Sequence, residues 1–237
     1  MIARAVAVLQ TLEGKPAGLN MSQIARDAGL PRSTTQRLVG AWVAQRFLVV
    51  DGNGRIHLGP ALARLAVAAR AETLATLHPH LEALRDQVQE TVHLWAGFGP
   101  EVVLVDQVVC NQEVRVVTPI GVGLPCAYSA GGKALLAGLS DTEVRRLTEG
   151  RMVAFTPHSL TRLDALLEEL AQVRAAGIAF DYEQHSEDVA AVGVALPNAG
   201  GDPLALCIPA PLRRFLEKRE RLVEAILKCR DRIAQEA

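Results

Sequence analysis

The sequence predicts an α+β fold in two parts: a small unit of three helices and a β-hairpin, followed by a larger unit of strands and helices. Three observations predict it. Apolar residues recur at helical spacing in residues 1–45, two short segments suited to strands flank the turn 51–54, and tight turns separate further strands after residue 90. With 237 residues, 49% of them hydrophobic and 22% charged, the chain is long enough for two units and apolar enough to bury a core.

The first two helices are short. The first is predicted by apolar residues at helical spacing before Gly14, which ends it: Ile2, Ala5, Val6, Leu9 and Leu12. Ser22 is expected to N-cap the second helix, which runs to Ala28 with Ile24 and Ala25 facing inward. Gly29 then breaks this helix.

The third helix and the hairpin complete the small unit. Pro31 suits the first turn of the third helix, whose buried stripe is expected at Leu38, Val39, Trp42 and Val43. The segments 47–50 and 55–58 surround the turn 51–54 and predict a β-hairpin. Three short helices and a hairpin are typical of a winged helix-turn-helix domain, expected over residues 1–59.

A helix rich in Ala, Leu and Arg is predicted next, as a linker over residues 60–77 with a pattern that continues to about residue 84. Strands are then predicted at 91–96, 102–108, 113–118, 192–196 and 204–208, the last two flanking the turn 198–202. Helices are predicted to begin near Lys133, at the capping box Ser140–Glu143, near Leu163 (ending at Gly177) and near Phe215. Residues 78–237 therefore predict an α+β domain on a mostly antiparallel sheet.

Charge divides the chain unevenly. Residues 1–70 hold nine Lys and Arg against three Asp and Glu, a net charge of +6, and the remainder carries −7. A basic first third is typical of a module that binds a polyanion. The four cysteines are widely spaced without a zinc-finger pattern and are expected to be free, buried thiols. With no signal-peptide core and no apolar run fit to span a membrane, the chain is expected to be cytoplasmic.

The start of the third helix carries the residues suited to reading DNA. If Leu38 and Trp42 face the core, polar side chains project outward from the turns that meet base edges in the major groove. Arg pairs well with guanine, Gln with adenine, and Ser and Thr reach phosphates or bases. The alternative is an ordinary solvated helix face. The residues expected to contact DNA are Ser22, Arg32, Ser33, Thr34, Thr35, Gln36, Arg37 and, on the hairpin, Arg55.

The sequence resembles the IclR family (isocitrate lyase regulator type) of transcriptional regulators. The segments that carry the likeness follow in the family's order along nearly the whole chain: 3–9, 22–34, 58–60, 90–92, 131–137 and 180–183. The resemblance implies a GAF-like effector-binding domain, control of catabolic or stress genes, and dimers or dimers of dimers on palindromic operators. For a dimer contact we expect one helical face formed by Leu62, Leu65, Ala66 and Ala69.

The resemblance also implies an effector site. Its residues would be Leu124, Cys126, Ala130, Gly131, Asp181, Val189, Ala191, Cys207 and Pro209. Backbone N–H groups of Ala130 and Gly131 at a helix start are suited to hold a carboxylate, and Asp181 to accept a bond from an effector hydroxyl or, equally, to serve as a cap. Lys133 is not assigned to the ligand. This sequence has fewer hydroxyls and more alanines than the family pattern at the loop proline, after Asp181 and at Pro209, which favours an aromatic or larger organic acid.

Two other hypotheses use other residues. Ser129, in the sequence Ala127–Gly131, approaches a nucleophile elbow, with Asp164 or Asp181 and then His185 in the order that an α/β-type serine hydrolase needs; the preceding segment, however, is a poor strand. His78, His80 and His93 could together bind a metal, although such histidines more often lie on a solvated face. Neither a metal nor a cofactor is expected.

Overall fold

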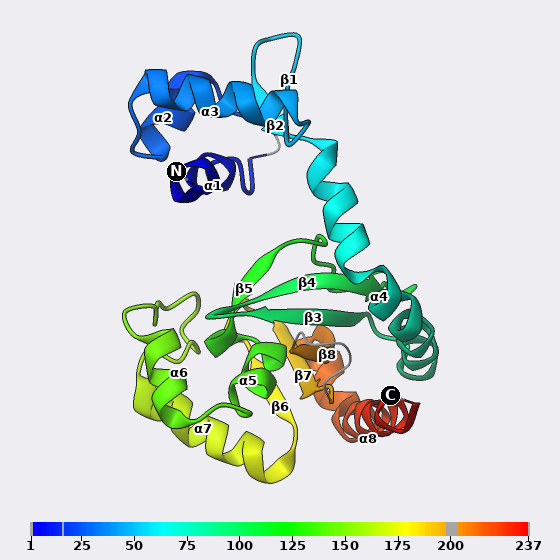
Figure 1. Cartoon of the computed structure of the whole chain (residues 1–237). Coiled ribbons are helices and arrows are strands. Elements are labelled where there is room, and N and C mark those ends of the chain that lie inside the picture. Colours follow the sequence, from blue (N-terminus) through cyan, green and yellow to red (C-terminus); the bar gives the residue numbers. More distant parts are fainter. Residues whose placement is uncertain (1, 16, 198–202, 237) are drawn as a thin grey trace. The chain divides into compact units, whose positions relative to one another are not determined.

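The computed structural model describes residues 2–15, 17–197 and 203–236, without the side chains of 63–64 and 66–70 (Figure 1). The predicted turn 198–202 therefore lies outside the described residues. The chain divides into two compact units, residues 1–71 and 72–237, and each is described by itself. Among the described residues, no helix is both long and apolar enough to cross a membrane.

The N-terminal unit has the predicted three helices and hairpin. Its elements are α1 (Ile2–Gln10), α2 (Met21–Asp27), α3 (Arg32–Ala44), β1 (Leu48–Val50) and β2 (Ile56–Leu58). The hairpin is antiparallel, and Asp51 closes its turn by accepting bonds from the backbone N–H groups of Asn53 (2.9 Å) and Arg55 (2.8 Å). Trp42 Nε1 on α3 donates to the carbonyl of Ala5 on α1 at 3.1 Å, so the helices and hairpin enclose one small core.

Two predictions about this unit are wrong in detail. Val8 of α1 and Leu12 in the turn after it are buried, whereas Ile2 and Val6 are exposed. Nearly every residue of α1 is apolar, so spacing alone does not decide which face packs inward. The N-cap of α2 is Asn20 rather than Ser22: Asn20 Oδ1 accepts from Gln23 N, and Gln23 Oε1 accepts from Asn20 N, both at 2.9 Å.

The C-terminal unit is built on one six-stranded antiparallel sheet in the order β5-β4-β3-β8-β7-β6. Its strands are β3 (Val92–Phe98), β4 (Glu101–Val108), β5 (Gly123–Pro125), β6 (Ala179–Tyr182), β7 (Val189–Ala195) and β8 (Leu204–Pro211). Its helices are the second half of α4 (Pro60–Val88), η1 (Cys126–Tyr128), α5 (Ala130–Leu136), α6 (Asp141–Thr148), α7 (Leu163–Ala176) and α8 (Leu212–Glu236). The predicted linker 60–77 is the first part of α4.

Helices cover both faces of this sheet (Figure 1). Because side chains alternate along a strand, Leu94 and Ala96 of β3 join the core formed with α4 and α8. His93 and Trp95 point to the opposite face, where α5, α6 and α7 pack. The sheet therefore separates two cores, and the pocket described below lies on the α5 side.

Two strand predictions differ from the structure. Residues 113–118 do not form a strand: Val114 is 69% exposed and Val117 is 49% exposed, and β5 instead pairs with the outer edge of β4. The short strand β6 was not predicted, because its sequence around Asp181 was interpreted as a cap or turn. It lies at the other edge of the sheet, paired with β7.

Candidate DNA-binding surface and effector pocket

The helix pair α2 and α3 has the geometry of a helix-turn-helix. Gly29 takes φ +64° in the turn between the helices, a conformation that glycine adopts without steric cost. Val39 of α3 packs with Ile24 of α2 in the core. This packing fixes which face of α3 remains exposed.

The exposed face carries most of the predicted DNA-contacting residues. Arg32, Ser33, Gln36 and Arg37 are exposed, and Thr34 is half-buried. Thr35 contradicts the prediction: it is fully buried, and its Oγ1 donates to the carbonyl of Pro31 at 3.1 Å. Its position in α3 turns it toward α2, so the Thr35 side chain belongs to the core and not to the surface.

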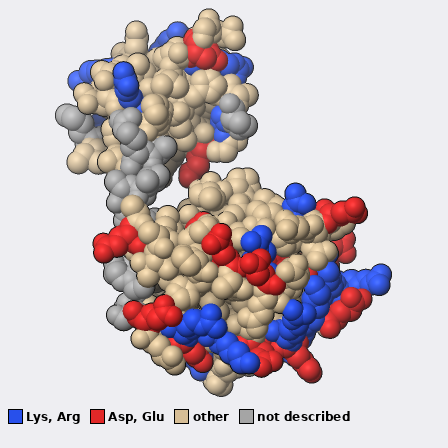
Figure 2. Space-filling model, turned by 90° about the vertical axis from the view of Figure 1, so that its right-hand side faces the viewer, with Lys and Arg blue, Asp and Glu red and all other residues tan. Residues whose placement is uncertain are grey.

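Two arginines make contacts within the unit. Arg32 Nη1 donates to Ser22 Oγ at 3.1 Å, which connects the start of α3 to α2. Arg55 Nη1 donates to the carbonyls of Ala17 (3.1 Å) and Gly18 (2.8 Å), which connects the hairpin to the segment before α2. Both side chains remain exposed, and several Lys and Arg patches are visible on this unit with few acidic ones (Figure 2). The surface is thus basic, which favours binding to the phosphate backbone of DNA.

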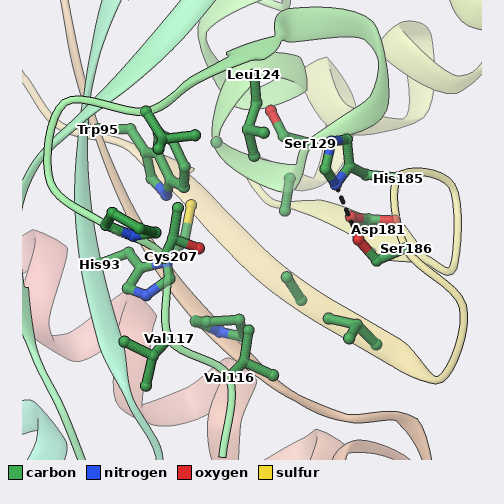
Figure 3. Close-up of a pocket in the computed structure, with 18 residues that line it drawn as sticks. His93, Trp95, Val116, Val117, Leu124, Ser129, Asp181, His185, Ser186 and Cys207 are labelled. Atoms are coloured by element: carbon green, nitrogen blue, oxygen red, sulfur yellow. Dashed lines mark hydrogen bonds between the residues drawn. The ribbon is translucent and has the colours of Figure 1, made fainter. Parts of the chain in front are cut away.

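A cavity of about 260 Å³ lies between the sheet and the start of α5 (Figure 3). Eight of the nine residues implied for the effector site line it: Leu124, Ala130, Gly131, Asp181, Val189, Ala191, Cys207 and Pro209. Cys126 does not. It is buried on η1 with its Sγ directed at the Gly99 carbonyl (3.9 Å), and burial raises the pKa of its thiol to about 12. Cys126 is therefore a core residue.

Other lining residues were not predicted. They are His93 and Trp95 on β3, residues 116–119 and Val122 of the loop before β5, Ser129 before α5, and His185 and Ser186 after β6. His93 is the strand partner of Cys207, so it shares the pocket side of the sheet with a residue that was predicted. The walls are mainly apolar, with a few polar groups between them, which is typical of sites for small organic molecules.

Two ionisable side chains in the cavity are strongly perturbed. Asp181 is 7% exposed, and its Oδ1 accepts from Gln184 N at 2.8 Å. Burial raises its pKa to about 6, although the Lys133 charge acts in the opposite direction. His93 is 2% exposed, and burial lowers its pKa to about 4, against the effect of a hydrogen bond with the Gln107 side chain. At neutral pH the cavity therefore presents a neutral imidazole and a carboxylate that is easily protonated.

Lys133 is a structural residue. It is fully buried, and its Nζ donates to Glu169 of α7 and to the side-chain oxygen of Gln184. Desolvation lowers its pKa, which the Glu169 carboxylate opposes. Its contact with Glu169 holds α5 to α7.

Glycines allow α5 to lie close to its neighbours. A Cβ on Gly132 would lie 2.3 Å from the Cα of Cys126, and a Cβ on Gly193 of β7 would lie 2.8 Å from the carbonyl carbon of Ala130. Both distances are shorter than side chains tolerate. Only glycine at these two positions permits the packing of η1, α5 and β7 that forms one wall of the cavity.

The geometry does not support the hydrolase alternative. Ser129 Oγ caps α5 by accepting from Gly132 N at 3.1 Å, and His185 Nδ1 shares a hydrogen bond with Ser186 Oγ at 3.0 Å. Ser129 also follows a 3₁₀ turn rather than a buried strand, so the elbow geometry is absent. Likewise, His78 Nδ1 pairs with Asp106 (2.7 Å) and His93 lies in the cavity, so the described residues do not bring the predicted histidines together.

A helix-turn-helix with a basic surface, joined to a domain with a small-molecule cavity, defines a ligand-responsive DNA-binding regulator. Family models agree: residues 1–52 match the IclR helix-turn-helix domain, and residues 65–235 match the C-terminal domain of bacterial IclR transcriptional regulators. The chain belongs to the IclR family of transcriptional regulators, which are not enzymes.

Individual relatives match over nearly the whole chain. The transcriptional regulator Rv1719 of Mycobacterium tuberculosis is 34% identical over 228 residues, covering 96% of this chain and 88% of that protein. The regulator TtgV of Pseudomonas putida is also 34% identical, over 230 residues with the same coverage of both chains. A crystal structure of an IclR homologue from Microbacterium hydrocarbonoxydans in complex with 4-hydroxybenzoate superposes with a TM-score of 0.83, at 25% identity, covering 98% of this chain and 96% of that one.

Proposed function

We propose that a small organic acid, preferably aromatic, binds the cavity beside α5 and changes the affinity of the protein for a palindromic operator. The observation that carries this proposal is the cavity itself, enclosed by apolar walls and lined by eight residues implied by the resemblance. An engineered apolar cavity of about 150 Å³ binds benzene, so one of about 260 Å³ has room for a substituted ring. The 4-hydroxybenzoate in the related structure supports the same ligand class.

The genes controlled from that operator are proposed to form a catabolic operon, and the protein to act in the cytoplasm, where bacterial DNA lies. We assign residues 1–59 to DNA binding, 60–77 to the linker and 78–237 to effector binding. Arg32, Ser33, Gln36 and Arg37 are proposed to read the operator from the exposed face of α3. Ser22, Thr34 and Arg55 are proposed to contact the DNA backbone nearby.

The acid group of the effector is proposed to bind at the α5 end of the cavity. Gly132 N–H already donates to Ser129 Oγ, and Gly131 N–H is directed at Cys207 Sγ. The donors that remain there are the Ser129 hydroxyl and the Ala130 N–H, which has no acceptor within its own helix. Both residues line the cavity, so a carboxylate beside them would complete their hydrogen bonds.

The test compares ligand binding with DNA binding. Benzoate, 4-hydroxybenzoate and the uncharged benzyl alcohol are titrated into the protein by calorimetry, and each is added to a complex with a DNA site selected from a random pool. We expect the acids to bind and to change the affinity for the selected site. Acids that bind without any change in DNA affinity, or binding by the alcohol alone, would contradict the proposal.

A matched pair of variants locates the site. Ala191→Leu places a larger side chain in the cavity and should weaken acid binding by at least about tenfold, which corresponds to about 1.4 kcal/mol. Ala175→Leu makes the same change on the exposed face of α7 and should leave acid binding unaltered. DNA affinity without ligand should be the same for both variants and the wild type.

We also propose a homo-oligomer, a dimer or a dimer of dimers, with the first part of α4 as a dimer contact. Leu65 there is 56% exposed, a large apolar side chain that a partner helix would cover. The side chains of Ala66 and Ala69, which were expected to share this face, lie outside the described residues. Light scattering should give at least twice the chain mass for the wild type, and Leu65→Glu should lower the mass at equal concentration, whereas Glu72→Gln should not.

A further inference from the structure

The cavity beside α5 contains a carboxylate but no strongly basic side chain. Among the described residues that line it, none is Lys or Arg, and Asp181 is the single acidic one. Asp181 is 7% exposed, so water screens its charge only weakly. An anionic ligand in this cavity would therefore meet a second negative charge, without a permanent positive charge on the walls to balance the two.

Lys133 of α5 acts on the Asp181 carboxylate but is not available to a ligand. Its side chain is fully buried, and its Nζ donates to Glu169 of α7 and to the side-chain oxygen of Gln184. Lys133 and the backbone N–H groups of Gln184 and His185 lower the pKa of Asp181, whereas burial and the charge of Glu169 raise it. The charge of Lys133 is already paired with Glu169, so it does not compensate a ligand carboxylate.

Asp181 lies close to the proposed binding site of the ligand carboxylate. The Cys207 thiol connects the two places: a Cβ on Gly131 would lie 2.8 Å from Cys207 Sγ. Burial raises the pKa of this thiol, and the charge of Asp181 raises it further. In Figure 3, Asp181 and Ser129 lie on one side of the cavity and His93 lies on the other. A carboxylate held at Ser129 would thus interact strongly with the charge of Asp181.

We infer that the cavity binds an acid together with one proton from the solvent, and that Asp181 carries this proton. The protonated carboxyl group of Asp181 then donates a hydrogen bond to the carboxylate of the ligand, where two anions would otherwise repel each other. This inference rests on the proposed function and deepens it, because it adds a condition for binding: the same acid binds more tightly at lower pH.

Two histidines also line the cavity and compete for the proton. Protonation of Asp181 removes a buried charge, whereas protonation of His93 or His185 creates one. The pKa values follow this difference: burial raises the pKa of Asp181 to about 6, lowers that of His93 to about 4 and also lowers that of His185. A second carboxylate beside Asp181 raises its pKa further, so the complex holds the proton there at neutral pH.

The test measures proton uptake on binding. Benzoate, benzyl alcohol and benzylamine present the same ring with a negative, a neutral and a positive group. Each is titrated into the wild type by calorimetry between pH 6 and pH 8.5, in two buffers that differ in ionisation enthalpy. We expect benzoate to bind with about one proton at pH 7.5, and its affinity to fall about tenfold per pH unit above pH 7. Benzyl alcohol should bind with little proton uptake.

Three variants locate the proton. Asp181→Asn keeps the size of the side chain and can donate to a carboxylate at any pH, so benzoate should bind it without proton uptake. At pH 8 this variant should bind benzoate at least about tenfold more tightly than the wild type does. Glu187→Gln makes the same chemical change at an exposed residue that does not line the cavity, and it should retain the uptake. His185→Gln removes the competing imidazole and should retain the uptake as well.

The outcomes separate this inference from the proposed function. Benzoate binding to the wild type without proton uptake, or with the same uptake as benzyl alcohol, overturns the inference and leaves the acid effector standing. Uptake that persists in Asp181→Asn, or that is lost in His185→Gln, also overturns it. Benzylamine binding more tightly than benzoate over the whole pH range, or no binding of benzoate at any pH, contradicts the proposed effector class and the inference with it. The wild-type measurements decide the question even if Asp181→Asn does not fold.

Discussion

Asp181 is an acid whose burial should be measurable as a pH dependence of stability. Its pKa rises from 3.8 to about 6 in the folded protein, mainly because the carboxylate is desolvated. Above pH 6 the group is ionised in both the folded and the unfolded state, so desolvation of the carboxylate destabilises the folded state in full. Two pKa units correspond to about 3 kcal/mol. Asp181→Asn removes this cost and keeps an oxygen that can accept from Gln184 N.

The direction of this pH dependence follows from proton uptake by the folded protein. Between about pH 6 and pH 4, the folded wild type binds a proton at Asp181 while the unfolded chain does not, so acidification stabilises the wild type through this group. Asn does not titrate. The free energy of unfolding of Asp181→Asn minus that of the wild type should therefore be roughly 2.4 kcal/mol larger at pH 7 than at pH 4, where the unfolded carboxyl is itself partly protonated.

Tryptophan fluorescence gives the assay. The chain has two tryptophans, and Trp95 lies in the cavity, so a Trp42→Phe background makes urea unfolding report on the C-terminal unit. Unfolding curves at half-unit pH intervals from 4 to 8 are compared with and without Asp181→Asn. If the free energies of unfolding of the two proteins differed by the same amount at every pH, the reasoning would be refuted. Asp181 would then have an ordinary pKa in the folded protein.

Three further outcomes are expected. His93→Gln should show the opposite trend, because the folded pKa of His93 is about 4 against 6.5: relative to the wild type, its free energy of unfolding should grow by about 3 kcal/mol as the pH falls from 7 to 4 in the same assay. Gln36→Ala should cost about 1–3 kcal/mol on the selected DNA site and relax preference at one base pair in binding-site selection; equal losses on random DNA would contradict a base-reading role. Gly132→Ala should lower the melting temperature sharply or prevent folding, because its Cβ would meet the Cys126 backbone, whereas Gly138→Ala, whose nearest contact is 3.4 Å, should change it little.

Local sequence signals predicted much of the fold. The Asp51–Gly54 turn, the Ser140–Glu143 capping box and the end of α7 at Gly177 all appear in the structure. Each depends on residues close together in the chain, whose hydrogen bonds or backbone angles are set by the residue type itself. Gly177, for example, takes φ +67° at the C-terminus of its helix, a position at which glycine is common.

Predictions that depend on distant partners were less accurate. Residues 113–118 alternate apolar and polar residues as a strand does, but the edge of β4 pairs with 123–125 instead. Glu90 was noted only as part of the family resemblance. In the structure it is 1% exposed and pairs with Arg214 (2.6 Å) and Lys218 (2.8 Å), more than 120 residues away. No local pattern indicates such a pairing.

In the candidate site, too, the residues that depend on contacts between distant parts of the chain were not predicted. Family resemblance supplied eight lining residues but not His93 or Trp95, because β3 is buried on both faces and its sequence does not alternate between apolar and polar residues. Which of its residues face the cavity depends on the register with β8. Thr35 shows the same difficulty in the DNA-binding unit. Along a helix, a shift of one residue moves a side chain from the surface to the core, and Thr35 is buried.

The Gly131–Gly132–Lys133 sequence has a packing role in the structure. Gly131 lies against Cys207, Gly132 lies against the Cys126 backbone, and Lys133 is bonded to Glu169. These contacts pack the start of α5 tightly against η1, β8 and α7. Residues 116–118 on the opposite side of the cavity lie outside any strand, and Val117 among them is half exposed. We therefore predict that a ligand bound beside Ser129 displaces this loop more than it displaces α5.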